Sequence, residues 1–449
     1  MAVLFKRDLL NELETWKSSS ERKPLILRGA RQVGKTTVVK IFAGQFDHFI
    51  FMDLEKSEEK AICEEASSFQ EFLDALFFFN KVPKNSGTTL IFFDEIQNSP
   101  KTVSWLRFFK EETPHLYVIA AGSLLETLLH THISFPVGRV EYRFLYPLSF
   151  YEFLAAMGET DLLEFLNADT IPNFVHHSLS KWFHKYLLMG GMPEAIQRYV
   201  TTRDLLQLNS VYDSLINSYM DDVEKYAKNP TSRNILRHCI RSSFFEAGKR
   251  IKFQGFGQSN YRSREIGETL RTLEKSHLIK LLYPTTNTRL PLVQDLKKSP
   301  KLQLLDTGLV NYMVGLQEEI FRQPQIDKIY DGRIAEHIVG QELLTLQSST
   351  VQPLVFWTRE KKQSTAEIDF LLSLNAMAIP MEVKAGPTGK LRSLRLFMDM
   401  VDHPYAIRVY SGPLAVDHIT SIKDKKFKLL NLPFYLVGVW QNQLQKILT

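Results

Sequence analysis

The sequence predicts a multidomain α/β protein that begins with a parallel sheet, and three observations lead to this fold class. An apolar run leads into a glycine-rich loop at residues 29–36 and then into a helix-compatible segment. Two further apolar runs, at 89–93 and 116–121, end in polar residues, as buried parallel strands do. Two β-prone runs within 367–384 flank a short turn. With 449 residues the chain is too long for one core, and about three domains are expected.

Composition sets broad limits on function. The 55 basic and 50 acidic side chains leave a net charge of +5, which permits contact with an anionic polymer without requiring it. The cysteines Cys63 and Cys239 lie far apart in sequence, which excludes a disulfide framework and a cysteine-rich zinc site and favours a reducing compartment. No apolar run approaches the roughly 20 residues of a spanning helix. We therefore expect a cytoplasmic protein with no membrane partner.

The glycine-rich loop has the residues of a phosphate-binding loop. Backbone N–H groups and the start of a helix point toward one place, which suits the phosphates of a nucleotide. We expect Lys35 to reach the β- and γ-phosphates and the Thr36 hydroxyl to ligate magnesium. The expected cofactors are thus ATP and Mg²⁺. The residues predicted to contact the nucleotide are Gly29, Ala30, Arg31, Gln32, Val33, Gly34, Lys35, Thr36 and Thr37.

The next apolar run ends in two acids, Asp94 and Glu95. Ligands of open α/β sheets bind at the carboxyl ends of the strands, so these acids are expected beside the phosphate loop. We assign Asp94 to the magnesium ion and Glu95 to the attacking water, as the catalytic base.

Two further residues have two interpretations each. Ser123 follows the third apolar run, where it is either a sensor of the γ-phosphate or the N-cap of a following helix. Arg139 is the nearest arginine that could act as a catalytic finger on the phosphate, and the alternative is an ordinary surface ion pair.

Five motifs together resemble a known family. They are the Gly-x-x-x-x-Gly-Lys-Thr loop, Asp94-Glu95-Ile96-Gln97, Gly122-Ser123, residues 146–154 and residues 190–194. The chain is similar along nearly its whole length to AAA-type ATPases of bacteria and archaea that carry a helical region and a C-terminal domain of unknown function. The resemblance implies that the Ser123 strand lies between the phosphate-loop strand and the Asp94 strand. AAA relatives often form rings, so the resemblance implies that a homo-oligomer is possible. Arg139 would then act either within its own chain or across a subunit interface.

The chain divides into four expected domains: a P-loop ATPase core at 1–145, a helical lid at 146–228, a winged-helix-like domain at 229–320 and a C-terminal domain at 321–449. The third has an amphipathic helix at 263–276 followed by two β-prone runs. Its basic residues could follow a phosphate backbone, but acids alternate with them, so DNA contact and a purely structural role both stay open. The basic residues are Arg262, Arg264, Arg271 and Lys275, and the acids are Glu265, Glu268 and Glu274.

The C-terminal hairpin is predicted to gather charged side chains on one face. If Asn375-Ala376 forms the turn, Asp369 stands opposite Glu382, and Glu367 stands opposite Lys384. Such a group suits a hard divalent cation, Mg²⁺ or Mn²⁺, with Asp369 and Glu382 as ligands and Lys384 facing the attacking water or a phosphate.

The spacing of Asp369, Glu382 and Lys384 resembles the PD-(D/E)xK nuclease core. The resemblance implies a restriction-endonuclease-like α/β domain with these three as catalytic residues. It also implies that Glu336, on a preceding helix, joins the metal site. The alternative is a solvent-facing charged hairpin without a ligand.

The leading functional hypothesis couples ATP hydrolysis to a metal-dependent nuclease-like domain that acts on nucleic acid, with DNA favoured over RNA. A second hypothesis is a non-cleaving ATP-dependent switch that binds nucleic acid or a protein, and a third is an ATP-dependent scaffold.

Overall fold

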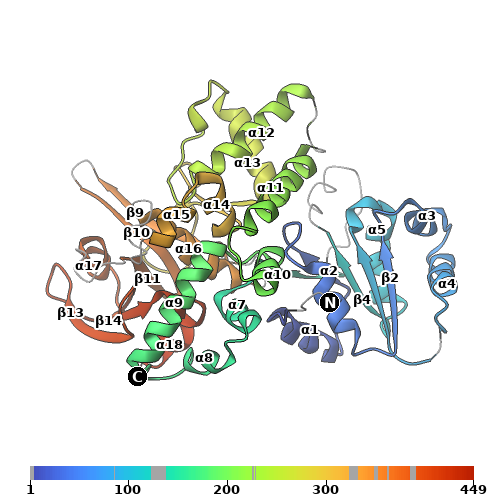
Figure 1. Ribbon diagram of the computed structural model, residues 1–449, viewed down its shortest axis with the longest axis horizontal. Helices are drawn as coiled ribbons and strands as arrows, with labels where there is room; N and C mark the ends of the chain where they lie inside the picture. Colours follow the sequence, from blue (N-terminus) through green and yellow to red (C-terminus); the bar gives the residue numbers. More distant parts are fainter. Residues whose placement is uncertain are drawn as a thin grey trace. The chain divides into compact units, whose positions relative to one another are not determined.

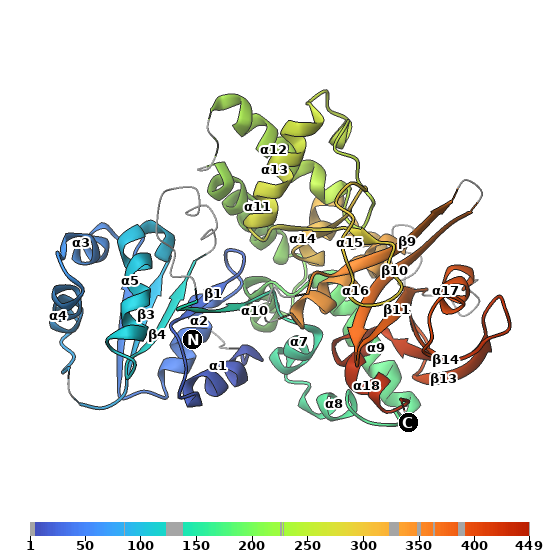
Figure 2. The same ribbon diagram turned by 180° about the vertical axis from the view of Figure 1, so that it is seen from behind.

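The computed structural model describes residues 5–84, 86–122, 138–224, 227, 229–322, 332–347, 352–361, 364–384 and 391–448. The chain forms two compact units, shown as ribbons in Figures 1 and 2. Unit 1 comprises Met1–Tyr146 and Lys275–His277, and unit 2 comprises Pro147–Glu274 and Leu278–Thr449.

Unit 1 is built on a parallel sheet with the strand order β2-β3-β4-β1-β5. The strand β4 lies between β1 and β3, as the family resemblance implied. The elements of the unit are α1 (Leu9–Ser18), β1 (Leu25–Arg28), α2 (Lys35–Ala43), β2 (His48–Asp53), α3 (Ser57–Glu65), α4 (Phe69–Phe79), β3 (Thr89–Asp94), η1 (Ile96–Asn98), α5 (Pro100–Glu111), β4 (Tyr117–Ala121) and β5 (Glu141–Phe144).

Helices cover both faces of this sheet, with α1 and α2 on one face and α3, α4 and α5 on the other (Figure 1). Every residue of β3 is buried, which explains its continuous apolar run. Phe72 of α4 stacks on Phe93 of β3, and Phe109 of α5 packs against both. This packing fixes the carboxyl end of β3, where Asp94 lies.

The first part of unit 2 is helical, as expected for residues 146–228. It contains α7 (Phe150–Met157), α8 (Thr160–Phe165), α9 (Asn173–Met189), α10 (Pro193–Thr202) and α11 (Leu208–Glu224). Ser149 and Glu152 form a capping box that begins α7.

A buried aspartate explains the two glycines at 190–191. Asp306 is completely buried and accepts hydrogen bonds from the backbone N–H groups of Gly191 at 2.5 Å and Leu309 at 3.2 Å, so that it caps α14. A Cβ atom on Gly190 would lie 2.1 Å from the Asp306 carboxylate. Glycine is therefore required by this close approach, and burial raises the pKa of Asp306 to about 6.

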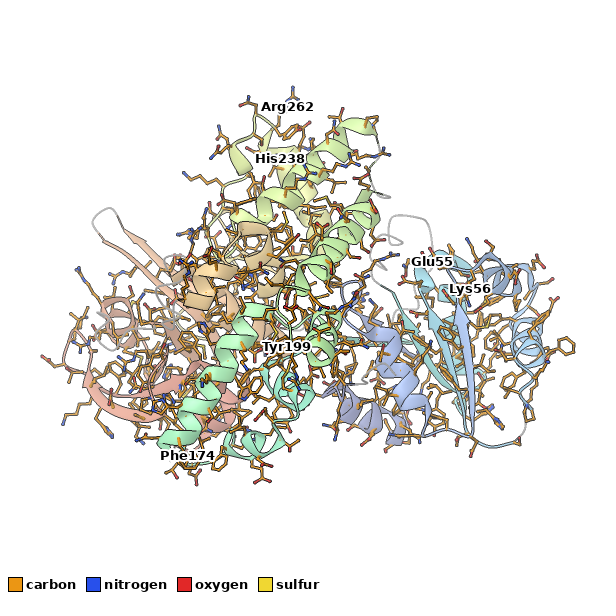
Figure 3. The ribbon with its side chains drawn as sticks, in the orientation of Figure 1. Glu55, Lys56, Phe174, Tyr199, His238 and Arg262 are labelled. Atoms are coloured by element: carbon orange, nitrogen blue, oxygen red, sulfur yellow. The ribbon has the colours of Figure 1, made fainter. Side chains whose placement is uncertain are left out.

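The segment expected to resemble a winged helix contains α12 (Pro230–Phe245), η2 (Phe256–Gln258), α13 (Ser263–Lys275), β6 (Ile279–Leu282), β7 (Pro284–Thr285), β8 (Lys301–Leu304) and α14 (Thr307–Val314). The helix at 263–275 confirms the predicted amphipathic helix, and β6 pairs with β8 in an antiparallel sheet. Arg264 forms an ion pair with Glu268 at 2.9 Å. The acids that alternate with the basic residues in the sequence therefore engage at least one of them. Arg262 is exposed and points outward (Figure 3).

The C-terminal part of unit 2 is a mixed sheet with the order β13-β14-β12-β11-β10-β9-β7. Its elements are α15 (Gln317–Arg322), α16 (Arg333–Thr345), β9 (Val355–Lys361), β10 (Ser364–Leu374), β11 (Met377–Val383), α17 (Arg392–Met398), β12 (Tyr405–Tyr410), β13 (Ala415–Thr420), β14 (Lys426–Pro433), η4 (Phe434–Val439) and α18 (Trp440–Gln445). Phe397 of α17 packs edge-on against Trp357 of β9, within the hydrophobic core between α17 and the sheet.

The hairpin of β10 and β11 has the predicted register. Leu374 pairs with Met377, and the turn residues Asn375 and Ala376 both have positive φ, at 48° and 61°. The pairing continues to Phe370 and Met381, which places Asp369 and Glu382 next along the two strands. No helix within the described part of the chain is both long enough and apolar enough to cross a membrane.

Candidate nucleotide site and carboxylate cluster

The loop between β1 and α2 is shaped by two glycines. Gly34 has a φ of 96° immediately before α2 begins. Gly29 has a φ of 145°, and a Cβ atom there would lie 2.2 Å from the carbonyl oxygen of Leu145. Both positions need glycine for conformational reasons, and Gly29 also needs it because another backbone segment lies against the loop.

The side chains expected to act on phosphates and magnesium come together at the start of α2. The buried Lys35 donates from Nζ to the carbonyl oxygens of Gly29 at 3.0 Å and Ala30 at 2.8 Å. The Thr36 hydroxyl donates to Asp94 Oδ2 at 2.5 Å. Thr36 and Asp94, 58 positions apart, therefore meet at one point and fit the ligand set of a magnesium ion.

The acid that follows β3, Glu95, is held by its own turn. Glu95 has a φ of 50°, and its backbone N–H donates to Asp94 Oδ1 at 3.1 Å. Its carboxylate accepts a hydrogen bond from Gln97 Nε2 at 2.5 Å. Burial raises the pKa of Asp94, and the hydrogen bond from Thr36 opposes that rise. Gln97 thus orients the predicted base, a role that sequence reasoning did not assign to it.

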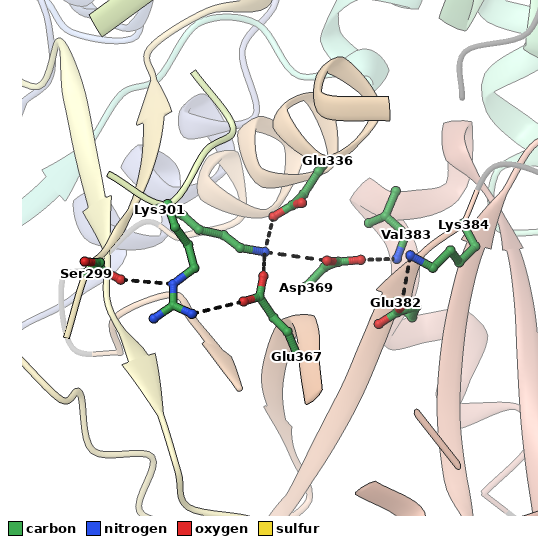
Figure 4. Close-up of polar contacts among 9 residues, drawn as sticks. Ser299, Lys301, Glu336, Glu367, Asp369, Glu382, Val383 and Lys384 are labelled. Atoms are coloured by element: carbon green, nitrogen blue, oxygen red, sulfur yellow. Dashed lines mark hydrogen bonds and ion pairs between the residues drawn. The ribbon is translucent and has the colours of Figure 1, made fainter. Parts of the chain in front are cut away.

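In unit 2, the hairpin acids form a cluster around two lysines (Figure 4). Lys384 Nζ lies 3.2 Å from Glu382 Oε1, and Asp369 Oδ2 accepts from the backbone N–H of Val383 at 2.8 Å. Glu382 is 5 % exposed, and its Oε2 has no hydrogen-bond partner among the described residues. Burial, reinforced by the negative charge of Asp369, raises the pKa of Glu382 to about 8.

The second lysine, Lys301 of β8, was not expected from the sequence. Its Nζ lies 2.5 Å from Glu336 Oε1, 2.8 Å from Glu367 Oε1 and 3.5 Å from Asp369 Oδ1. Glu336 therefore lies in the cluster, where its carboxylate is engaged by a lysine, and its role as a metal ligand stays a prediction. Among the residues that the structure describes, no three His, Cys, Asp or Glu side chains are grouped so that they hold a metal ion by themselves.

Three family models match successive parts of the chain. The first is described as an AAA domain and matches residues 21–154, which contain the phosphate loop and Asp94. The N-terminal part of this chain is an AAA-type P-loop ATPase domain. Residues 180–320 match a domain of unknown function, DUF8612, and residues 331–435 match another, DUF4143. No curated protein matches the chain.

Solved structures resemble the chain weakly. A Walker-type ATPase of Pyrococcus abyssi is 15 % identical, with a TM-score of 0.46 over 69 % of this chain and 96 % of that one. The Orc1 protein of Aeropyrum pernix, solved in complex with DNA, is 14 % identical, with a TM-score of 0.30 over 70 % and 94 %. The RuvB Holliday-junction branch-migration motor of Thermotoga maritima is 14 % identical, with a TM-score of 0.28 over 65 % and 93 %. At these values the likenesses assign no function to this chain.

Two residues proposed for the AAA domain remain predictions. Arg139 is 55 % exposed and pairs with Glu111 at 2.8 Å, an arrangement that belongs to the surface-pair interpretation. Its role as a finger is not tested by this pair. Ser123 lies outside the described residues.

Unit 1 also has contacts at the phosphate loop that the motifs did not indicate. The buried guanidinium of Arg7 donates to the carbonyl oxygens of Val33 at 2.9 Å and Tyr146 at 2.6 Å, so it links the phosphate loop to the end of unit 1. Arg31 of the loop lies 3.8 Å from Glu55, which follows β2 (Figure 3). The partners of Arg7 are 26 and 139 positions away, and no local pattern marks such contacts.

Proposed function

We propose that this protein is an ATPase whose nucleotide cycle controls a metal-dependent nuclease-like domain acting on nucleic acid, with DNA as the favoured substrate. The ATPase half is supported by the AAA match and by the contact between Thr36 and Asp94. The nuclease half is supported mainly by one observation, the unpartnered and buried Glu382 oxygen beside Asp369 and Lys384.

In the AAA domain, the residues divide the work of ATP hydrolysis. Lys35 would exchange its two carbonyl partners for the β- and γ-phosphates, and Thr36 with Asp94 would hold magnesium. Bound magnesium supplies positive charge against the phosphates. Glu95, oriented by Gln97, would place and deprotonate the attacking water.

In the carboxylate cluster, one divalent ion would be held by Asp369 and Glu382. Magnesium commonly uses one or two protein carboxylates together with substrate phosphates, so a site of two carboxylates needs no third acid. Bound metal supplies a Lewis acid at the scissile phosphate. The Lys384 ammonium would stand against the phosphate oxygens or the attacking water.

The decisive experiment measures cleavage of DNA and of RNA by the full-length protein with Mg²⁺ or Mn²⁺. Asp369→Asn and Lys384→Ala are compared with Asp402→Asn, a matched control at an exposed aspartate that pairs with Arg289 on the surface. We expect the first two to lose cleavage by about 100-fold or more, and the control to keep it. Equal cleavage by all proteins would identify a contaminant and contradict the proposal.

One observation favours a second candidate, a non-cleaving ATP-dependent switch or scaffold that binds nucleic acid or a protein partner. Lys301 already forms ion pairs with Glu336, Glu367 and Asp369, so part of the negative charge of the cluster is balanced without a metal. Salt-sensitive nucleic-acid binding that survives Asp369→Asn, without cleavage, would support the switch. If the protein binds neither nucleic acid nor metal, the scaffold hypothesis remains.

A further inference from the structure

Lys301 is an unusual residue for the interior of a protein. It lies in β8, is 4 % exposed and packs with Nζ 4.9 Å from the centre of the Phe356 ring. A buried ammonium is costly unless opposite charge surrounds it. Here the charge comes from two elements of the C-terminal domain, α16 and β10, whereas Lys301 comes from the segment before them (Figure 4).

The carboxylates keep this lysine charged. Its Nζ forms ion pairs with Glu336, Glu367 and Asp369, and this negative charge compensates the cost of burying the ammonium. Arg250 adds a second positive charge, since its Nη1 lies 3.6 Å from Glu367 Oε2. The three acids on this side of the cluster therefore face two fixed positive charges.

The position of the ammonium conflicts with that of a metal. A divalent ion shared by Glu336 and Asp369 would lie about 2.0–2.6 Å from an oxygen of each. Lys301 Nζ already lies between them, 2.5 Å from Glu336 Oε1 and 3.5 Å from Asp369 Oδ1. Both cations cannot occupy that space, because repulsion between them is strong in a buried site.

The lysine is carried by a fixed backbone rather than by a loop that can withdraw. Strand β8 pairs with β6, and Leu302 exchanges backbone hydrogen bonds with the segment at 248–249, at 2.8 and 2.9 Å. All four residues of β8 are buried. This arrangement fits an ammonium group that stays in the cluster better than one that moves out of it.

We propose that the Lys301 ammonium is a built-in cation that takes the place of a divalent ion between Glu336 and Asp369. Any metal that the cluster binds is then confined to its other side, at Asp369 and Glu382. This inference rests on the proposed function for the substrate class, but it concerns a separate property, the number of ions bound. Lys301 is accordingly a positioning residue that acts through Glu336 and Asp369.

The test counts Mn²⁺ ions bound by the full-length protein, without nucleotide, by calorimetry and by the electron paramagnetic resonance of free Mn²⁺. Every protein carries Asp94→Asn, so that metal at the AAA domain is not counted. We expect Lys301→Met to bind one Mn²⁺ more per chain than its parent, and Glu336→Gln added to it to abolish that gain. Lys280→Met, on the neighbouring strand β6, is the matched control and should bind the same number as the parent.

The outcomes separate this inference from the nuclease proposal. A gain of one ion in Lys301→Met over a parent that binds none would support the built-in cation and contradict the proposed metal site at Asp369 and Glu382. A parent that binds two ions in the cluster, or a count that stays at one in folded Lys301→Met, would overturn the inference alone. Absence of Mn²⁺ from both proteins would overturn both.

A purely structural lysine would lower the melting temperature on substitution without creating a new ion site. Lys301→Met should instead recover thermal stability on addition of Mn²⁺ to a greater extent than its parent. If Lys301→Met does not fold, Lys301→Met with Glu367→Gln removes one uncompensated charge while Glu336 and Asp369 are kept. The same gain of one ion is then expected, and its absence counts against the inference.

Discussion

At the scale of single residues, the nucleotide site depends on a contact that brings two motifs together. The Thr36 hydroxyl and the Asp94 carboxylate meet at 2.5 Å, and Asp94 uses its other oxygen to hold the turn at Glu95. One aspartate therefore orients both a prospective metal ligand and the prospective catalytic base.

Thr36→Val tests this contact, because valine keeps the branched shape of threonine and removes only the hydroxyl. We expect the Mg²⁺-dependent ATPase rate to fall about 100-fold, since a ligand of the ion is lost. Nucleotide binding in the presence of a chelator should be retained. The measurement is steady-state phosphate release, with Thr15→Val on the exposed face of α1 as the control. A Thr36→Val protein with the wild-type rate would contradict the assignment.

Contacts between residues were predictable from the sequence where both partners belong to recognisable motifs. Other contacts were not. Thr36 and Asp94 were identified from the phosphate loop and from the acids at the end of β3, because the chemistry of a nucleotide site needs both. Arg7 and Lys301 were missed, because their partners lie in distant segments and a lone basic residue is usually a surface residue.

At the scale of elements, alternation of side chains predicted the β10–β11 hairpin well. Period-two spacing and one turn assignment sufficed to set the register, although Asn-Ala is not the favoured Asn-Gly turn. The second β-prone run after the helix at 263–275 is β8, but the pattern could not indicate that the lysine of this short strand enters the same cluster. The fold of the N-terminal sheet followed from buried strands that end in polar residues, together with the family resemblance.

The cap of α14 gives a pH-dependent prediction. The pKa of Asp306 is about 6 in the folded protein and about 3.9 when unfolded, so between these values only the folded state keeps the proton. The free energy of unfolding should therefore fall as pH rises from 4 to 6, by about 3 kcal/mol from this group. Asp306→Asn cannot ionise and should lack this contribution.

The measurement compares melting temperatures across pH. The melting temperature of the wild type relative to Asp306→Asn should decline between pH 4 and pH 6.5 and then level off. Asp402→Asn, at an exposed aspartate, should keep a constant difference from the wild type. A difference that rises with pH would show that the backbone donors of Gly191, Leu309 and Gly308 outweigh burial.

At the scale of the whole molecule, the proposed function requires that nucleotide and nucleic acid influence each other. Thermodynamic linkage makes this influence reciprocal, so a nucleotide that tightens DNA binding must itself bind more tightly when DNA is present. The composition leaves this open, since a net charge of +5 neither requires nor forbids such a partner.

We expect a non-hydrolysable ATP analogue with Mg²⁺ to tighten DNA binding at least about fivefold, and DNA to tighten binding of the analogue by the same factor. Fluorescence anisotropy with labelled DNA and with labelled nucleotide measures the two sides. Lys35→Ala should abolish the effect and leave the salt dependence of DNA binding unchanged. Identical DNA affinity with and without the analogue would contradict coupling and favour the scaffold.

The close approach at Gly29 has a mechanical consequence. Leu145 lies against the loop, Arg7 ties Val33 to Tyr146, and the chain passes from unit 1 into unit 2 at the very next peptide bond. A force applied at Pro147 would therefore act, through these contacts, on the loop that is predicted to bind the phosphates. Residues 145–146, which come just before unit 2 in sequence, therefore contact the loop predicted to hold the nucleotide, directly and through Arg7.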